Sequence, residues 1–362
     1  MHSEQGWPHR AERLPDAAPG LRRAEGGLRL GGGAARASST PAPLVSYVTV
    51  VRNGERTLAR TLQSVREQRW PNVEHIVLDG ASSDGTLALI QAHAGQIDYY
   101  ASEPDQGLYD ALNKAINLAQ GALVCVLNAD DWLTPDAAEL AVRAHQAAGS
   151  PDVHLVLTAA WLMKPSGRRL WLPGPLDLAG YLRCANICHN GVYATPGAYR
   201  ASGPYALDLK IAADFRWLMA TVDAGVPATA IDEPTVHYAP GGLSSNVQQH
   251  TQDCARVLGQ RFPFLAAAEV WGLLHAFHSF RGNLAPFAST RPAHLGRFLA
   301  ALAHRHAVQG DFMAVLAQAC ASTLQHPDDR RAAGQLSTGE KLHRGWRKLR
   351  MHLRRQPRPK AG

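Results

Sequence analysis

Acidic residues follow two strand-like stretches of this sequence. Asp79 ends the apolar run at 73–78, and the adjacent pair Asp130 and Asp131 follows a second apolar run at 123–127. If both runs are buried strands of an open α/β sheet, their carboxyl ends lie at the edge where such sheets bind ligands. Two adjacent carboxylates offer the hard oxygen ligands that Mg²⁺ or Mn²⁺ prefers, and these ions usually accompany substrate phosphates. The pattern predicts a site for a nucleoside diphosphate and a divalent cation.

The same acids also have a purely structural interpretation. Asp130 and Asp131 could form an Asx turn before a helix that the sequence predicts to begin at Pro135, with Thr134 as its N-cap. Asp214, in the stretch KIAADFRWL, could likewise cap the helix that follows it. Convergence of several acids from different strands favours the ligand site, because a turn needs only one of them.

The spacing of apolar residues predicts the elements that would position these acids. β-Branched runs alternate with helical patterns through the first half of the chain, and four βα units in a row predict a mostly parallel, right-handed sheet of the α/β class. The expected strands are 44–51, 73–78, 97–101, 123–127 and 153–160, followed by a hairpin around 165–167. The expected helices cover 58–65, 87–90, 108–119, a segment from 135, a segment from 214 to 222, and much of 252–326.

Charge is distributed unevenly over the 362 residues, whose net charge is +7. Residues 341–360 carry nine Lys or Arg and no acid, residues 1–43 carry six basic against four acidic residues, and the remainder carries 22 basic against 26 acidic residues. The high net charge therefore belongs to the tail, and no nucleic-acid partner is expected for the mildly acidic body. A nucleic-acid-binding protein that uses this tail remains one alternative.

We expect four segments: a disordered leader at 1–43, a nucleotide-binding and catalytic domain at 44–250, a helical extension at 251–330 and a basic amphipathic tail at 331–362. The leader lacks the apolar core of a secretory signal, and no uncharged apolar run reaches membrane-spanning length. Five scattered cysteines fit a reducing cytoplasm. We expect a cytoplasmic protein that could bind the inner face of the membrane, because the positive charge of 341–360 suits an anionic membrane surface.

Cys184, Cys188 and His189 have a spacing that invites a metal-site hypothesis. No fourth ligand at a zinc-type spacing accompanies them, so buried thiols and a histidine that lines an acceptor cleft are the preferred interpretation.

Four motifs in order, namely a first strand, VLDGASSDGT, EPDQGLYDALNKA and VLNADD, resemble glycosyltransferase family 2. The resemblance covers Leu44 to about Asn246. It implies the Rossmann-like GT-A fold and the transfer of a sugar from a UDP-, GDP- or dTDP-sugar to an acceptor hydroxyl, with inversion at the anomeric carbon. The implied acceptor is a glycan or a lipid-linked molecule in the synthesis of a bacterial surface polysaccharide or other glycan, and the implied cofactor is Mg²⁺ or Mn²⁺.

Matched motif by motif, the resemblance assigns a role to each acid. Asp79 is expected at the nucleotide base, Asp130 near the ribose or the donor sugar, and Asp131 on the metal that holds the diphosphate. Asp214 takes the place of the general base, and His189 is expected on the acceptor side. The donor-binding residues expected in addition are Thr49, Asn53, Glu55, Asn113 and Lys114.

Elementary chemistry supports these roles. A divalent ion neutralises charge on the leaving diphosphate, and a carboxylate takes the proton of a poorly nucleophilic hydroxyl. For Asn113 and Lys114, an expected helix amino end favours anions, although solvation is an equal alternative for Lys114. The Gln-x-x-Arg-Trp signature of processive relatives is absent, because Ala213 stands three positions before Arg216-Trp217 where that signature has Gln. We therefore expect a non-processive enzyme.

The rival enzyme class is a nucleotide-binding α/β enzyme such as an oxidoreductase or a nucleotidyltransferase. The turn after the first strand reads RNGERT and lacks the Gly-x-Gly-x-x-Gly pattern with which dinucleotide-binding enzymes approach a pyrophosphate. This absence disfavours the oxidoreductase.

Overall fold

The computed structural model describes residues 8, 10–16, 20, 23–31 and 42–325. The contacts divide the chain into two compact units, unit 1 with residues 1–176 and 187–246, and unit 2 with residues 177–186 and 247–362. The predicted basic tail at 331–362 lies outside the described residues.

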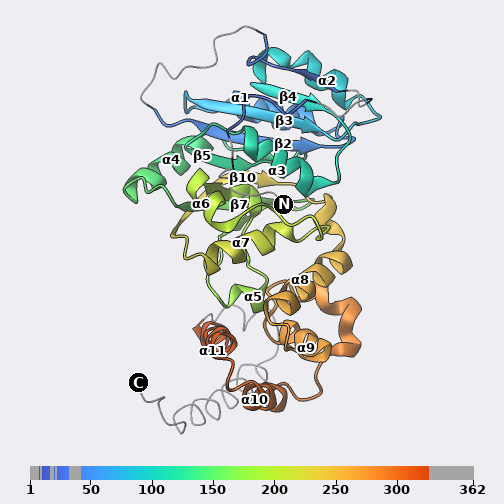
Figure 1. Ribbon diagram of the computed structural model, residues 1–362, viewed down its shortest axis with the longest axis vertical. Helices are drawn as coiled ribbons and strands as arrows, with labels where there is room; N and C mark the ends of the chain where they lie inside the picture. Colours follow the sequence, from blue (N-terminus) through green and yellow to red (C-terminus); the bar gives the residue numbers. More distant parts are fainter. Residues whose placement is uncertain (1–7, 9, 17–19, 21–22, 32–41, 326–362) are drawn as a thin grey trace. The chain divides into compact units, whose positions relative to one another are not determined.

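A mixed, mostly parallel sheet organises unit 1, as the sequence predicts (Figure 1). Its first half consists of parallel strands in the order β4-β3-β2-β5, with Val51 of β2 opposite Asp79 of β3 and Asp79 opposite Ser102 of β4. The bounds are β2 Val45–Val51, β3 Val73–Asp79, β4 Tyr99–Ser102 and β5 Leu123–Val126. The apolar, β-branched runs form these strands because both faces of a parallel sheet are covered by helices.

Helices follow the four parallel strands β2 to β5 at the predicted positions. They are α1 Leu58–Arg66, α2 Thr86–Ala92, α3 Leu108–Leu118 and α4 Ala137–Ala147. The predicted start of the fourth helix is wrong, because α4 begins two residues after Pro135 with Asp136 at its N-cap. The Thr134 hydroxyl donates instead to carbonyl oxygens of Pro234 and Thr235, which ties this corner to strand β10.

The second half of the sheet is mostly antiparallel. Strand β9 lies between β5 and β7 and runs opposite to both, whereas β7 and β10 are parallel. The predicted hairpin is confirmed, with Lys164 opposite Gly167. The bounds are β6 Trp132–Leu133, β7 Leu155–Lys164, β8 Gly167–Trp171, β9 Val192–Ala194 and β10 Ala228–Tyr238, with helices α6 Pro196–Ser202 and α7 Ala213–Asp223 and the 3₁₀ turns η1 Ala94–Gln96, η2 His189–Gly191 and η3 Leu243–Ser245.

Part of the expected disordered leader is ordered, which corrects the prediction for these residues. Strand β1 (Ala24–Gly26) extends the sheet by pairing antiparallel with β4. Arg23 forms an ion pair of 2.7 Å with Glu103, and Arg29 pairs with the buried Glu74. The side chains of these pairs are only about a tenth exposed or less, so charged residues of the leader are buried against the body, which net charge alone does not indicate.

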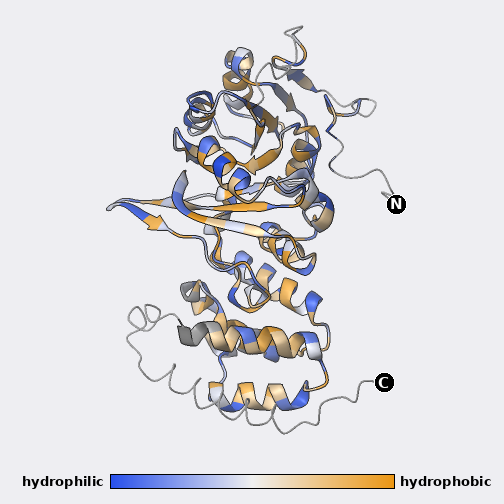
Figure 2. Cartoon of the chain, turned by 90° about the vertical axis from the view of Figure 1, so that its left-hand side faces the viewer, coloured by the Kyte–Doolittle hydropathy of each residue, from blue (hydrophilic) through white to orange (hydrophobic). Residues whose placement is uncertain are grey.

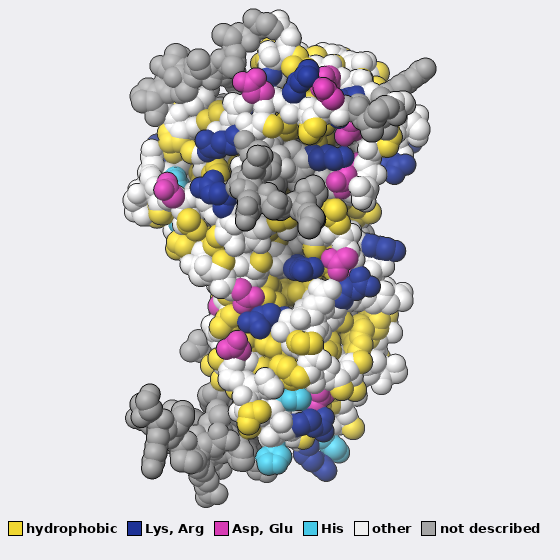
Figure 3. Space-filling model, viewed as in Figure 1, with side chains coloured by type: hydrophobic (Ala, Val, Ile, Leu, Met, Phe, Trp, Pro, Cys, Tyr) yellow, Lys and Arg dark blue, Asp and Glu magenta, His cyan; other side chains and the backbone are white. Residues whose placement is uncertain are grey.

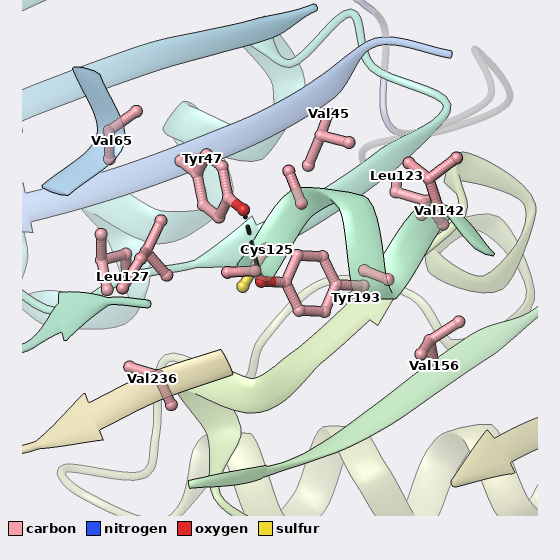
Figure 4. Close-up of a cluster of buried hydrophobic side chains, with 14 of the residues drawn as sticks. Val45, Tyr47, Val65, Leu123, Cys125, Leu127, Val142, Val156, Tyr193 and Val236 are labelled. Carbon is pink, nitrogen blue, oxygen red and sulfur yellow. Dashed lines mark hydrogen bonds between the residues drawn. The ribbon is translucent and has the colours of Figure 1, made fainter. Parts of the chain in front are cut away.

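Residues of β2, β5, β9 and α4 contribute to a buried hydrophobic cluster at the middle of the sheet (Figure 4). Tyr47 and Tyr193 are fully buried within it, meet edge to face at 6.1 Å between ring centroids, and share a hydrogen bond of 3.3 Å between their hydroxyls. This bond gives each of the two buried hydroxyls a polar partner. The hydropathy colouring agrees, since the strands of the sheet are largely hydrophobic and the helices have hydrophilic faces (Figure 2).

Unit 2 is helical in its described residues. Its elements are α5 Gly180–Arg183, α8 Val247–Arg261, α9 Ala267–Phe277, the 3₁₀ segment η4 Arg281–Thr290, α10 Leu295–Arg305 and α11 Gly310–Gln325. The sequence-based division placed 177–186 in the catalytic domain, whereas its contacts assign it to unit 2, because α5 packs on α8, α9 and α11. None of the helices within the described ranges is both long and apolar enough to cross a membrane.

Candidate active site

The candidate site lies at the carboxyl edge of the parallel strands, where the sequence placed it. Asp79 ends β3, and the loop that carries Asp130 and Asp131 follows β5. Strand β2 separates β3 from β5 in the sheet, so the two strand ends are roughly 10 Å apart at the usual strand spacing. The acids belong to two groups of contacts at this edge, one with Asp130, Asp131 and Asp214 and a neighbouring one with Asp79.

Asp131 is the most deeply buried of these acids, with 1% of its surface exposed. One carboxylate oxygen accepts the Asn190 side-chain amide and the other accepts the Ala239 backbone amide at 2.6 Å. The Thr61 hydroxyl donates to the Asp131 carbonyl at 2.7 Å and so anchors the loop to α1. Burial, followed by the neighbouring charge of Asp130, raises the pKa of Asp131 well above its usual value. A cation at this carboxylate would offset that cost.

Asp130 is half-buried, and burial also raises its pKa, while the charge of Arg60 opposes the shift. Arg60 donates to the Asp130 carbonyl at 3.1 Å and lies 3.5 Å above the Trp132 ring. On the other side, a Cβ atom added to Gly242 would lie 3.0 Å from Asp130 Oδ2. Gly242, in the glycine-serine stretch at 241–245, therefore lies directly against this carboxylate.

Asp214 lies in the first turn of α7, where its Oδ1 accepts the Phe215 amide at 2.8 Å. The Tyr109 hydroxyl, from α3, donates to the Ile211 carbonyl and lies 3.4 Å from Asp214 Oδ1. The Tyr109 ring stacks on Tyr205 at 5.7 Å. These contacts fix the half-buried carboxylate at the start of its helix.

The η2 turn connects the two acids that the sequence assigned to metal binding and base catalysis. Asn190 donates to Asp131, and the adjacent His189 bonds through Nε2 to the Tyr205 hydroxyl at 2.8 Å. Burial lowers the pKa of His189, and the negative charge of Asp214 acts against this. Just before the turn, burial raises the pKa of Cys188, and the charges of Asp131 and Asp214 raise it further. Both carboxylates therefore act on the same short segment.

Asp79 belongs to a neighbouring group. Its carboxylate is 2% exposed and accepts hydrogen bonds from Ser102 Oγ at 2.6 Å and from the Ser82 amide at 3.1 Å. Asp79 lines a small pocket together with Glu103, Asp105 and Lys114. Lys114 forms ion pairs with Asp110 at 3.0 Å and Glu103 at 3.3 Å.

Helix α3 links the two groups, because it carries both Lys114 and Tyr109. On the same helix, the Asn113 side chain donates to the Tyr205 carbonyl and accepts from the Tyr205 amide, both at 2.9 Å. Asn113 therefore fixes the segment before α7, and its amide already makes two protein contacts.

Three of the expected donor-binding residues, Thr49, Asn53 and Glu55, form hydrogen bonds within the protein. Thr49 is fully buried, and its hydroxyl lies 2.9 Å from His75 Nε2, so it is out of reach of a ligand in this structure. Asn53 and Glu55 accept the backbone amides of Ser83 at 2.9 Å and Gly85 at 2.7 Å. These two side chains join the loops after β2 and β3, which explains why polar residues stand there without requiring a ligand.

Sequence reasoning missed the residues that orient the acids: Arg60, Thr61, Tyr109, Asn190 and Tyr205. Asn190 is the most informative. It is 1% exposed, and its Oδ1 is one of four buried side-chain atoms without a hydrogen-bond partner in the described part of the chain. The adjacent Cys188 and His189 drew attention to this stretch, but no local pattern distinguishes Asn190.

The residues around Asp131 fit a divalent cation. Asp130 and Asp131 supply carboxylate oxygens, and the unpartnered amide oxygen of Asn190 adds a third hard acceptor. Oxygen donors of this kind suit Mg²⁺ or Mn²⁺. On the face drawn in Figure 3, Lys and Arg side chains are interspersed with Asp and Glu side chains.

Known proteins share this sequence pattern and this fold. Residues 46–159 match the family described as Glycosyl transferase family 2. An uncharacterized glycosyltransferase of Mycobacterium tuberculosis is 34% identical over 52% of this chain and 73% of its own length. A PGL/p-HBAD biosynthesis glycosyltransferase of Mycobacterium bovis is 30% identical over 48% of this chain and 68% of its own length.

Two solved structures resemble the fold at low sequence identity. Residues 1–349 of TarS from S. aureus, in complex with UDP-GlcNAc, give a TM-score of 0.53 at 15% identity and cover 86% of this chain and 91% of that chain. The mannosyltransferase PcManGT from Pyrobaculum calidifontis, in complex with GDP-Man and Mn²⁺, gives a TM-score of 0.50 at 18% identity and covers 85% and 88%.

Fold and relatives together define a glycosyltransferase of the GT-A fold. The chain belongs to glycosyltransferase family 2.

Proposed function

We propose that this enzyme transfers a sugar from a nucleoside-diphosphate sugar to an acceptor hydroxyl, with inversion at the anomeric carbon and with the help of Mg²⁺ or Mn²⁺. The η2 turn supports the proposal most strongly. Asn190 donates to Asp131, and the adjacent His189 bonds to Tyr205, whose ring stacks on Tyr109 beside Asp214. A metal ligand and a base must flank one reacting sugar, and one rigid turn can set their separation.

In this proposal the residues divide the work. Asp131, with Asp130 beside it, would hold the cation, which neutralises charge on the departing diphosphate. Asp214 would accept the proton of the attacking hydroxyl, and Tyr109 keeps its carboxylate in place. A single displacement assisted by one base inverts the anomeric carbon, whereas retention needs a carboxylate nucleophile on the opposite face of the sugar.

For the donor, the neighbours point to a nucleotide sugar. TarS was solved with UDP-GlcNAc and PcManGT with GDP-Man and Mn²⁺, so a UDP-, GDP- or dTDP-sugar is the proposed class. Asp79 and Lys114, which line the pocket beside α3, are the proposed contacts for the base and for a phosphate. Asp79 would act through its buried, serine-bonded carboxylate.

For the acceptor, we propose a glycan or a lipid-linked molecule, approached from the side of His189. A relative named for PGL/p-HBAD biosynthesis supports a glycan-building role. Because the processive signature is absent around Arg216 and Trp217, one sugar would be added per encounter. We also propose a cytoplasmic location and binding of the nine basic residues of 341–360 to anionic membranes, a prediction that rests on charge alone. Vesicle sedimentation with and without residues 335–362 tests it, and equal binding would refute it.

A donor screen tests the proposed reaction. UDP-, GDP- and dTDP-sugars are incubated with the enzyme, a simple alcohol or glycan acceptor, and Mn²⁺ or a chelator, and the products are followed by ¹H NMR. We expect metal-dependent release of a nucleoside diphosphate and a product of inverted anomeric configuration. Retention would refute the single displacement, and release of a sugar 1-phosphate, with the nucleoside monophosphate transferred to the acceptor, would favour the nucleotidyltransferase alternative.

A further inference from the structure

Three potential metal ligands meet inside unit 2. One ligand atom each from Cys184, Cys254 and His278 lies within 4.8 Å of the other two. Cys184 is 3% exposed, and the other two side chains are fully buried. Cys188 and His189, which stand close to Cys184 in the sequence, belong to unit 1 instead.

Backbone structure holds these three side chains together. Cys184 ends α5 with a φ of 56°, a left-handed conformation in which helices usually have glycine. The Ser279 amide donates to the Arg183 carbonyl at 2.8 Å, which joins the residue before Cys184 to the residue after His278. Cys254 lies on α8, which packs on both α5 and α9. The three ligands thus come from three segments that are far apart in sequence.

One ring nitrogen of His278 is buried without a hydrogen-bond partner. The Nδ1 atom accepts the Phe280 amide at 2.9 Å, whereas the Nε2 atom is the one without a partner. A buried polar atom without a partner is destabilising, and native structures rarely contain one without a reason. A metal at Nδ1 would replace the Phe280 hydrogen bond, and a metal at Nε2 would move the ring proton to Nδ1.

His250 offers a fourth potential ligand, a ring nitrogen, one helical turn from Cys254. Both ring nitrogens of His250 lie 3.9 Å from Cys254 Sγ, and the His250 and His278 ring centroids are 6.3 Å apart. Residues four apart on a helix share a face, so His250 and Cys254 can bind one ion. In a tetrahedral zinc site, sulfur and nitrogen ligand atoms are about 3.5–3.8 Å from one another, as zinc–ligand bonds of 2.0–2.3 Å require.

We propose that Cys184, Cys254, His278 and His250 bind a structural Zn²⁺ ion in unit 2. Thiolate and imidazole ligands select zinc over the oxygen-preferring Mg²⁺ and Mn²⁺. Zn²⁺ displaces two thiol protons, so that two Cys–SH, two neutral His and Zn²⁺ give the Cys₂His₂ complex and two H⁺. Four protein ligands leave no open position, which makes the role structural and independent of the proposed sugar transfer.

An ion at this position would fasten α5, α8 and the end of α9 to one another, which agrees with the assignment of residues 177–186 to unit 2.

Metal analysis of the intact chain tests the proposal. The full chain is purified without chelators and its metals are measured by mass spectrometry, while thiols are titrated in denaturant with a chelator. We expect about one zinc per chain and five free thiols. Replacement of zinc by Co²⁺ should give the ligand-field bands of a tetrahedral cobalt site and a thiolate-to-cobalt charge-transfer band.

Variants distinguish this site from other zinc binding. Cys184→Ser and Cys254→Ser should each lose the zinc, and Cys320→Ser, a matched change of another buried cysteine in unit 2, should keep it. Asp131→Asn should also keep it, so failure here is separable from failure of the proposed reaction. Where a variant does not fold, the zinc content and cobalt spectrum of the wild-type chain still decide.

Two results would overturn the proposal. One is substoichiometric zinc with five free thiols and no tetrahedral cobalt spectrum, which would mean that the cluster is a metal-free buried contact. The other is recovery of only three free thiols, which would mean that Cys184 and Cys254 form a disulfide instead.

Discussion

The side-chain amide of Asn190, in the η2 turn, donates to the buried carboxylate of Asp131, in the loop after β5. The remaining oxygen of this amide has no hydrogen-bond partner among the described residues. Asn190 can therefore orient the proposed metal ligand and offer an oxygen of its own.

Replacing Asn190 should weaken metal binding more than it weakens the fold. Asn190→Ala removes a partner that orients Asp131, and loss of such a partner typically reduces metal affinity about 10- to 100-fold. Mn²⁺ titration of the donor-dependent thermal shift measures the change. Gln63→Ala, an exposed amide on α1 that bonds only to Glu67, serves as the control and should leave the titration unchanged. Equal Mn²⁺ affinity in Asn190→Ala would exclude Asn190 from the site.

The pH dependence should follow Asp131. Metal binding needs its ionised form, and because burial raises its pKa, affinity should begin to fall at a higher pH than for an ordinary aspartate. Without metal, a raised folded-state pKa contributes stability below the unfolded pKa and loses it as pH rises through the folded value. Urea unfolding should therefore show Asp131→Asn gaining on the metal-free wild type as pH rises. A constant difference in unfolding free energy across pH would contradict this.

Asp214→Asn should separate binding from turnover. The amide cannot take a proton from the acceptor, so kcat should fall by about 10²- to 10⁴-fold while the donor Kd stays within about twofold. Release of the nucleoside diphosphate and calorimetric donor binding measure the two quantities. Asp208→Asn, which alters an exposed acid paired with Arg216 at 3.2 Å, is the matched control and should retain activity. Donor binding lost together with turnover in Asp214→Asn would argue against a base.

Thr49→Val should affect stability and not donor recognition. The Thr49 hydroxyl is fully buried against His75, whose pKa burial lowers to about 3, so the ring is neutral and depends on this hydrogen bond. Its loss should cost about 1 kcal/mol of unfolding free energy. Urea unfolding and the donor KM provide the two readouts. A raised KM at unchanged stability would restore Thr49 to the donor site.

Local pattern was enough for the first half of the sheet. Val45–Val51 and Leu123–Val126 are apolar runs, as expected of parallel strands that helices cover on both faces. The parallel topology also places Asp79 after β3 and Asp130 and Asp131 after β5 at one edge of the sheet. Strand β9 was not predicted, because it has only three residues, Val192–Ala194, and long-range pairing with β5 and β7 holds it between them.

The site was predictable in its acids but not in what orients them. Asp131 and Asn190 are 59 positions apart, and Tyr109 and Asp214 are 105 apart, so neither pair leaves a local signal. For the same reason, the spacing of Cys184 and Cys188 suggested a pair that the structure does not form. Polar residues near a strand end, such as Thr49 and Asn53, look alike in sequence whether they bind a ligand or a neighbouring loop.

Calorimetric titration of UDP and GDP into the wild-type chain and Asp131→Asn, each with and without Mn²⁺, tests most directly whether Asp131 holds the metal that grips the diphosphate. We predict that Mn²⁺ tightens binding of one nucleotide to the wild type at least tenfold and has no effect on Asp131→Asn. Equal Mn²⁺ enhancement in both proteins would contradict the account.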